Sequence, residues 1–218
     1  MITVQILREN PRILALIERA KNNLVKLGYT EHGLRHVSNV SRDAGAILRE
    51  LGYPERDVRL AEIAGFLHDM GAAINRNQHE QTGAILAMQV LEELGMPFDE
   101  VLDVATAIGN HHEETGEPVT EITAALILAD KIDVHRSRVV QQDIAHDIHD
   151  RVNYAATSSK VEVDPEKKVI RYMIDIDTQI APVMEYFEIF TDRMIIARKA
   201  ANALGCVFQL WINNTRML

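Results

Sequence analysis

Apolar residues recur every three or four positions through the first 157 residues of this chain, and strand-like alternation is absent there. That spacing lines up an apolar stripe along each helix, so it predicts helices that pack around one core. Residues 58–67 and 122–129 are apolar on nearly every side, which is typical of central, buried helices. The sequence therefore predicts a mainly α fold.

Glycine, proline and capping residues mark where the predicted helices begin and end. The first helical region is divided by Pro11 and ends at Gly28, and the next helix ends at Gly52. A further helix is predicted over residues 78–94, capped by residues 75–77, and another begins near the N-cap candidate Asp99.

After about residue 158 the apolar period changes to that of strands. Residues 160–164 and 169–176 alternate on either side of turn residues, which predicts a hairpin. A helix over residues 182–204 and a third strand over residues 206–212 follow. We therefore expect a helical domain over residues 1–157 and a small C-terminal α+β appendage of order β-β-α-β over residues 158–218.

Histidines and aspartates lie at the ends or on the inner faces of the predicted helices. They are His36, His68, Asp69, His79, His111, His112 and Asp130. Imidazole nitrogens and carboxylate oxygens are ligands that divalent transition metals use in sites left open for water. One histidine on an apolar face is usually a satisfied core residue, but this series together predicts a metal centre inside the bundle. His146 and His149 lie among aspartates, where we expect a solvated face.

The order His36, then His68-Asp69, then Asp130 resembles the H…HD…D pattern of the HD superfamily of metal-dependent phosphohydrolases, over roughly residues 30 to 140. The resemblance implies an HD-type helical bundle. It also implies that His36, His68, Asp69 and Asp130 hold a first metal ion.

The additional histidines resemble HD proteins that carry two or more metals. In that case Asp69 would bridge to a second ion held by His79 and by His111 or His112, and the sequence leaves this last choice open. His32 lies one helical turn before His36 and is a candidate for a further ligand or a substrate contact. The metal would be iron, manganese, zinc or nickel, because such sites bind each of them.

Two better-known branches of the superfamily fit less well. The segment HHEETGEP resembles the HHE segment of HD-GYP cyclic-di-GMP phosphodiesterases, but no Gly-Tyr-Pro follows it and Ala72 replaces their lysine. The segment LADKIDVHR is similar to bacterial HD-type hydrolases of diadenosine tetraphosphate. A lysine is also expected near the HD pair in those enzymes, and the segment HDMGAA of this chain lacks it. We therefore expect a multi-metal variant that is not a full HD-GYP protein.

The resemblance implies cleavage of a phosphoester of a nucleotide or another small phosphorylated metabolite, by a metal-activated water at a binuclear site. Asp69 is the expected catalytic bridge. The basic Lys131 and Arg136 are expected to bind phosphate, His135 and Arg138 are further candidates, and a solvated helix face is the alternative. Asn75, Arg76 and Gln78, in the loop just ahead of His79, are candidates to face the pocket, with an ordinary loop and helix cap as the alternative. Two other classes stay open: a di-iron oxygenase on the same fold, and a non-catalytic module with a structural metal.

Charge and cysteine content narrow the partners. The net charge of −9 disfavours a nucleic-acid groove or binding to anionic lipid. No run reaches the ~18 apolar residues of a membrane helix, and the first residues lack the order of a secretory signal. A single cysteine, Cys206, allows no internal disulfide, so we expect a cytoplasmic protein. The apolar strand around Trp211 is compatible with a homodimer or with a packed sheet edge.

Overall fold

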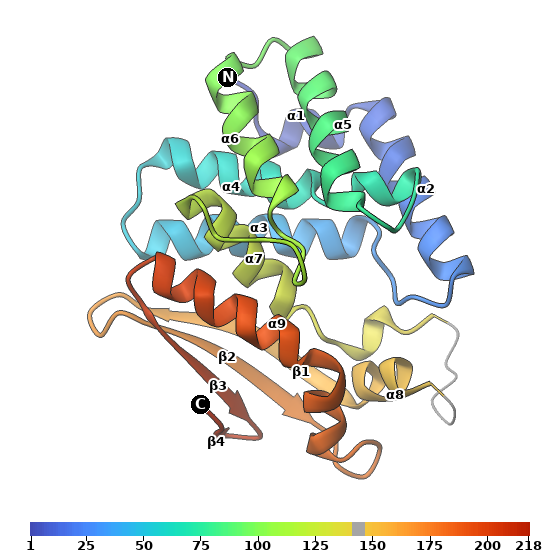
Figure 1. Ribbon diagram of the computed structural model, residues 1–218, viewed down its shortest axis with the longest axis vertical. Coiled ribbons are helices and arrows are strands. Elements are labelled where there is room, and N and C mark those ends of the chain that lie inside the picture. The colour runs from blue at the N-terminus through green and yellow to red at the C-terminus, as the bar shows by residue number, and fades with distance from the viewer. Residues whose placement is uncertain (141–146) are drawn as a thin grey trace.

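Helices make up most of the molecule, and a small sheet follows them in the chain (Figure 1). The computed structural model describes residues 1–140 and 147–218. Its elements are α1 Val4–Arg8, α2 Pro11–Lys26, α3 Leu34–Glu50, α4 Glu55–Leu67, the 3-10 turn η1 Met70–Ala73, α5 His79–Glu93, α6 Phe98–Gly109, α7 Glu121–Ile132, the 3-10 turn η2 Arg136–Arg138, α8 Ile148–Ala155, β1 Ala156–Asp164, β2 Val169–Ile176, α9 Val183–Ala203, β3 Val207–Ile212 and β4 Thr215–Arg216. The predicted mainly α fold with a small C-terminal sheet is confirmed.

The helices α4 and α7 form the centre of the bundle, as their apolar sequences predict. All residues of 122–129 in α7 are buried, as are most of those in α4. The helices α3 and α4 approach closely at Gly65, where an added Cβ would lie 2.7 Å from the Ser41 Cα. The Ser41 hydroxyl donates to the Glu62 carbonyl at 2.7 Å across the same contact. This close approach brings the C-terminal end of α4 beside the start of α3.

Several predicted helix ends are confirmed. Pro11 opens α2 and separates it from α1. Gly28 and Gly52 follow α2 and α3 with φ values of 85° and 79°, which favour glycine because it lacks a Cβ.

Two predicted N-caps are wrong. Helix α5 is capped by Gln78, whose φ is 57°, because the Asn75 side chain instead accepts a hydrogen bond from the Asn77 backbone within the preceding loop. Helix α6 begins one residue before Asp99, with Pro97 at the N-cap and without a side-chain cap. In both places the loop conformation, not a capping side chain, decides where the helix begins.

The strands form one sheet in the order β1-β2-β3-β4. Strands β1 and β2 pair antiparallel, and β3 returns parallel to β2 after α9. The short strand β4 was not predicted. It turns back on β3 through Asn213 and Asn214, whose φ values of 50° and 61° suit a tight hairpin. Trp211 in β3 is thereby flanked by β2 and β4, so this part of the edge is packed within the chain; a homodimer stays a prediction.

Helix α9 packs against both α7 and the sheet (Figure 1), and its buried residues include Tyr186, Phe190 and Met194. From the sheet, the Tyr172 hydroxyl donates to the Leu128 carbonyl of α7 at 2.6 Å. The core is continuous from the bundle into the sheet. Strand β1 begins at Ala156, two residues before the expected boundary, and the division into two domains stays a prediction.

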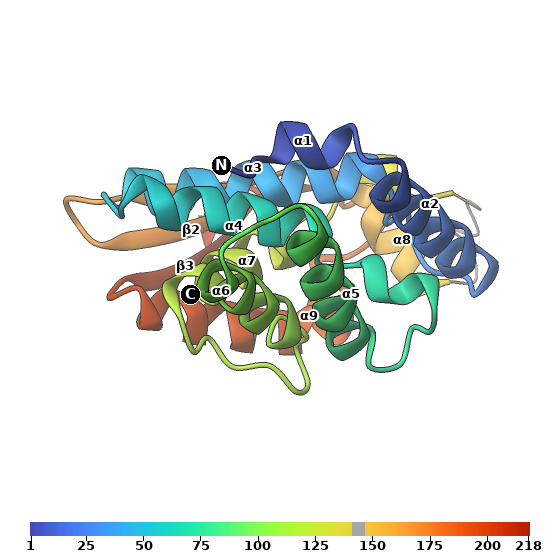
Figure 2. The same ribbon diagram turned by 90° about the horizontal axis from the view of Figure 1, so that it is seen from above.

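Seen from above, α2 and α8 lie at one end of the molecule and the β1–β2 turn lies at the other (Figure 2). The end that holds α2 and α8 is also where the chain brings η1 against α2. No helix among the described residues has the length and apolar character needed to cross a bilayer.

Candidate metal centre

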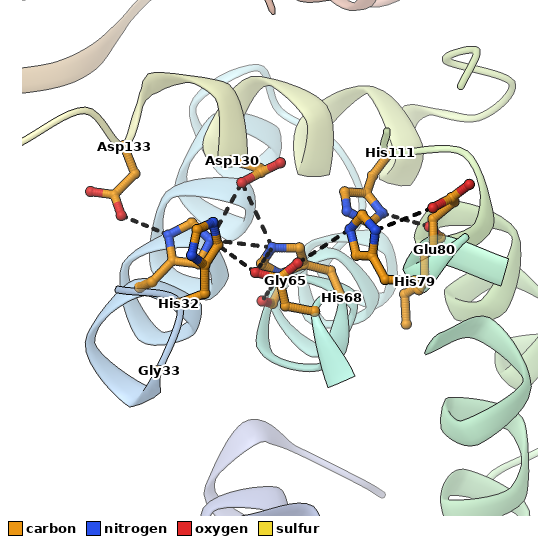
Figure 3. Close-up of polar contacts among 12 residues, drawn as sticks. His32, Gly33, Gly65, His68, His79, Glu80, His111, Asp130 and Asp133 are labelled. Carbon is orange, nitrogen blue, oxygen red and sulfur yellow. Dashed lines mark hydrogen bonds and ion pairs between the residues drawn. The ribbon is translucent and has the colours of Figure 1, made fainter. Parts of the chain in front are cut away.

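Five segments bring the predicted ligands together in the middle of the bundle (Figure 3). The residues are His36 in the first turn of α3, His68 and Asp69 after the last turn of α4, His79 at the start of α5, His111 just after α6, and Asp130 in α7. The four histidines are at most 3% exposed. Residues that are far apart in the sequence thus share one buried site.

Glycine at the end of the HD segment makes this convergence sterically possible. An added Cβ at Gly71 would collide with the His79 carbonyl oxygen and would lie 2.5 Å from the Gly83 nitrogen. Helix α5 can therefore begin directly against the turn that follows Asp69, which places His79 within 3.4 Å of an Asp69 carboxylate oxygen. Here the absence of a side chain positions a candidate ligand.

Three of the histidines are held by hydrogen bonds from Nδ1 to acceptors outside the cluster. These contacts are His36 Nδ1 to Asp133 Oδ2 at 2.6 Å, His68 Nδ1 to the Gly65 carbonyl at 2.9 Å, and His111 Nδ1 to the Ile108 carbonyl at 2.6 Å. An imidazole that donates from Nδ1 keeps a lone pair on Nε2 when it is neutral. The acceptors therefore aim Nε2 lone pairs into the centre, as in metal sites whose histidines are oriented by an outer partner.

Acceptor atoms consequently crowd one another in the centre. The Asp69 Oδ2 atom lies 3.5 Å from His36 Nε2 and 3.3 Å from His68 Nε2, while Asp130 Oδ1 lies 3.4 Å from His36 Nε2. The two Nε2 atoms are themselves 3.3 Å apart. Among the described residues, no hydrogen bond reaches the buried Asp69 Oδ2. Such an arrangement of lone pairs calls for a positive charge among them.

The pKa of His68 is shifted by the same need for a positive charge. Burial disfavours its charged form, but the Asp69 carboxylate outweighs burial and raises the pKa of His68 to about 9. Burial likewise opposes ionisation of Asp130, but neighbouring Lys131 and His36 hold the pKa of Asp130 well below its ordinary value. A divalent cation would supply the required charge, so these residues fit a metal ion.

Two overlapping groups of side chains are close enough to share an ion. One consists of His36, His68 and Asp130, and the other of His68, Asp69 and His111, with the candidate ligand atoms of each within 4.8 Å of one another. The second oxygen of Asp69 faces His79 Nε2 at 3.4 Å. The two Asp69 oxygens therefore face different histidines, an orientation suited to bridging.

The adjacent histidines occupy different environments. The His111 ring is buried, with its centroid 5.0 Å from that of His68 and 5.1 Å from that of His79. The His112 ring is only partly buried and lies beside that of His79, at 5.3 Å. The structure thus favours His111 as the inner residue of the doublet. His32 packs against His36 at 5.3 Å, and burial lowers the pKa of His32 well below its ordinary value.

The two predicted phosphate-binding residues are placed differently. Lys131 is buried beside the centre, where its Nζ contacts Asp130 Oδ2 at 2.6 Å and Glu113 Oε2 at 2.7 Å. Arg136 instead has its guanidinium 5.4 Å from the Tyr154 ring centroid. It lies outside the walls of the central cavity, the small cavity whose lining includes Asp69, His79, His111, Asp130 and Lys131. The role proposed for each in phosphate binding stays a prediction.

Sequence reasoning missed several polar residues around the centre. Asp133 orients His36, buried Glu80 lies 3.3 Å from His79 Nδ1, and Arg193 of α9 lines the central cavity. The i, i+3 spacing of Asp130 and Asp133 was a usable signal for Asp133, but Arg193 has none because it follows in a later unit. Of the loop candidates, Arg76 lines the central cavity, whereas Asn75 and Gln78 lie outside its walls. The side chain of His149 is 62% exposed, as expected, and His146 lies outside the described residues.

Comparison with known proteins gives three findings. Residues 33–136 match the HD domain family. Ribonuclease Y of Oceanobacillus iheyensis is 34% identical over 120 residues, which cover 55% of this chain and 21% of that protein, and Ribonuclease Y of Lawsonia intracellularis is 34% identical over 105 residues, which cover 48% and 19%. The matched segments thus span about a fifth of these relatives. A crystal structure of a predicted HD superfamily hydrolase from an uncultured Thermotogales bacterium aligns with a TM-score of 0.45 and 22% identity, covering 62% of this chain and 75% of that one.

Proposed function

Residues 33–136 of this chain are an HD domain, and on that premise we propose a metal-dependent phosphohydrolase that cleaves a phosphoester of a nucleotide or another small phosphorylated metabolite. The proposed metal ligands are His36, His68, Asp69, His79, His111 and Asp130. His112, outside the inner set, is the weaker candidate. Two divalent ions are proposed, with Asp69 as the bridge.

One observation carries this proposal. Histidine Nε2 atoms and carboxylate oxygens from separate segments face one another at 3.3–3.5 Å, and the buried Asp69 Oδ2 atom accepts no hydrogen bond from the described residues. A purely structural cluster would satisfy that oxygen with an N–H or O–H donor. Divalent ions bound there would polarise a phosphoryl group and make a water nucleophilic near neutral pH.

The surrounding residues hold the ligands in the form that this chemistry needs. Lys131 neutralises Asp130 at Oδ2, so the other oxygen stays directed toward His36. Asp133 accepts a hydrogen bond from His36 Nδ1, which keeps the Nε2 lone pair inward. Glu113 in turn holds Lys131 at 2.7 Å. These partners fix the ionisation and direction of the ligands before a substrate arrives.

The proposal names the chemical class of the substrate, a phosphoester, rather than one compound. Arg76 and Arg193 line the central cavity with Lys131, and guanidinium groups suit bidentate contacts to phosphate oxygens. The relatives are named ribonucleases, so RNA belongs beside mononucleotides in a substrate screen.

The test combines metal analysis with an activity panel. Protein purified without chelator is expected to carry a divalent metal and to release product from an aryl phosphodiester, an aryl phosphomonoester, a mononucleotide or a short RNA. Asp69→Asn is expected to lower metal affinity at least 10- to 100-fold, because even the removal of an outer partner of a metal ligand typically costs that much. Turnover should be lost with the metal. Asp103→Asn, a surface ion-pair residue of α6, serves as the matched control.

Two results would overturn the proposal. Full turnover by Asp69→Asn would separate the reaction from the metal centre. Oxygen consumption by the iron-loaded protein, without hydrolysis of any phosphoester, would assign the site to an oxidase or oxygenase.

A further inference from the structure

A second cavity adjoins the metal centre and is large enough for a small molecule. Its volume is about 310 Å³, at the lower end of the range for ligand pockets. It shares His32, Arg76, Glu113 and Arg193 with the walls of the central cavity. A ligand that fills this second cavity would therefore lie within reach of the metal centre.

The buried Arg138 lines this cavity and carries an unsatisfied donor. Its side chain is 2% exposed, and it donates from Nε to the Glu31 carbonyl at 3.1 Å and from Nη1 to the Asp133 carbonyl at 2.5 Å. Its Nη2 atom has no hydrogen-bond partner among the described residues. Because a buried guanidinium nitrogen without an acceptor is costly, a ligand oxygen is the expected partner.

Helix α9 supplies a second arginine from outside the HD domain. The Arg193 guanidinium lies 4.5 Å from the Phe190 ring centroid, and its Nε is 3.7 Å from Glu113 Oε1. Glu113 also binds the buried Lys131, so this chain of contacts links α9 to Asp130 of the metal centre. The side chain of Arg193 is 23% exposed, which leaves it held in place yet accessible from the cavity.

The charge and lining of the cavity indicate the kind of ligand. Three arginines, Arg76, Arg138 and Arg193, face two carboxylates, Glu113 and Asp147, in a chain whose net charge is −9. The remaining wall is partly apolar, with Leu27, Tyr29 and Ile189. This combination suits a molecule that carries both an anionic group and an apolar or ring-containing group.

We infer that α9 completes the substrate pocket of this enzyme, and that Arg193 and Arg138 bind the phosphate of a small organic phosphate about the size of one nucleotide. The inference rests on the proposed hydrolase function and deepens it by naming the residues that bind the substrate and the size of substrate that they accommodate. Arg193 is a substrate-binding residue that the HD domain itself does not contain, since the matched region ends at residue 136. The C-terminal unit thus helps to select the substrate.

The test measures ligand binding separately from turnover. Adenosine 5′-monophosphate and inorganic phosphate are titrated into the metal-loaded protein by calorimetry, and kcat and KM are measured on the best substrate of the activity panel. Arg193→Gln is expected to weaken binding of adenosine monophosphate about 10- to 100-fold, the range for a lost charged hydrogen bond, and to raise KM at unchanged metal content. Arg193→Lys should recover part of the affinity.

Arg198→Gln is the matched control, because Arg198 is exposed on the same helix and lies outside the cavity walls. Its affinity and KM should equal those of the unaltered protein. Unchanged affinity and KM in Arg193→Gln, in a protein that does hydrolyse phosphoesters, would overturn the inference and leave the proposed function standing. So would tighter binding of an RNA oligonucleotide than of the mononucleotide with no effect of Arg193→Gln.

Failure of the proposed function gives a different pattern. The metal-loaded protein would then hydrolyse no phosphoester. Binding of adenosine monophosphate that depends on Arg193 would still support the pocket, and binding that ignores Arg193 would refute it.

Discussion

Replacement of Asp133 by asparagine tests whether the histidine cluster is built to hold metal. Asp133 Oδ2 accepts a hydrogen bond from His36 Nδ1 at 2.6 Å, and the Asp133 side chain is only 9% exposed. Asparagine keeps the shape and one acceptor oxygen but removes the negative charge. The charge strengthens the hydrogen bond that orients His36, so its loss should weaken metal binding.

The size of the effect follows from the role of such partners. Removal of an outer partner of a ligating histidine typically costs 10- to 100-fold in metal affinity, or about 1.4–2.8 kcal/mol. The upper half of this range is expected for Asp133→Asn, because the bond is short and buried and Arg35 and Arg138 lose the same carboxylate partner.

Competition with a chromophoric chelator measures this affinity directly. Asp43→Asn, which changes a surface ion pair on α3, is the matched control and should bind metal as the unaltered protein does. Thermal unfolding of the metal-free variants shows whether each one is folded. An Asp133→Asn protein that is folded and has unaltered metal affinity would refute the view that Asp133 orients a metal ligand.

Three further predictions concern protons, packing and the join between the units. Since the pKa of His68 in the folded metal-free protein is raised from 6.5 to about 9, metal binding at pH 7 should release about one proton, and calorimetry in buffers of different ionisation enthalpy should show the release fading above pH 9. By the same sign, the metal-free protein gains stability from protonated His68 below pH 6.5 and loses that gain as the pH rises to about 9; urea unfolding that is flat over this window would contradict it. Gly71→Ala should cost about 1–3 kcal/mol in urea unfolding because its Cβ meets the backbone at the start of α5, whereas Gly109→Ala, with its nearest neighbour at 3.8 Å, should be tolerated; equal stabilities would refute the packing argument. Tyr172→Phe should cost about 0.5–1.5 kcal/mol by removing its bond to Leu128, and an unchanged denaturation midpoint would show that this bond does not stabilise the join.

The order of the elements was determined by local sequence alone. Period and turn chemistry act over a few residues, so Pro11, Gly28 and Gly52 marked helix ends that the structure confirms. The helix and strand periods also separated the bundle from the sheet that follows it. Where the backbone of a loop decided instead, as at Gln78 before α5, the local signal was misleading.

The candidate ligands were also visible from residue type and order, because the chemistry of a metal ligand is carried by single side chains. Which of these candidates lie close enough to share a metal ion was decided by the tertiary structure. Burial and ring contacts distinguish His111 from His112, and the burial of Lys131 between Asp130 and Glu113 places it in the ion-pair network beside the centre. The sequence around residues 111–112 and around Lys131 does not show these differences in burial, since the neighbours that produce them come from other helices.

The surroundings of the centre were decided by the fold alone. Arg193 lies 63 residues after Asp130 in the chain, yet packing of α9 against α7 brings both to the wall of one cavity. The Arg138 nitrogen and the Asp69 oxygen that find no hydrogen-bond partner within residues 1–140 and 147–218 are likewise products of the fold, because the chain has excluded water from them. Sequence determines which groups can bind a metal or a phosphate, and three-dimensional burial decides which of them must, because only an enclosed polar atom lacks water as a partner.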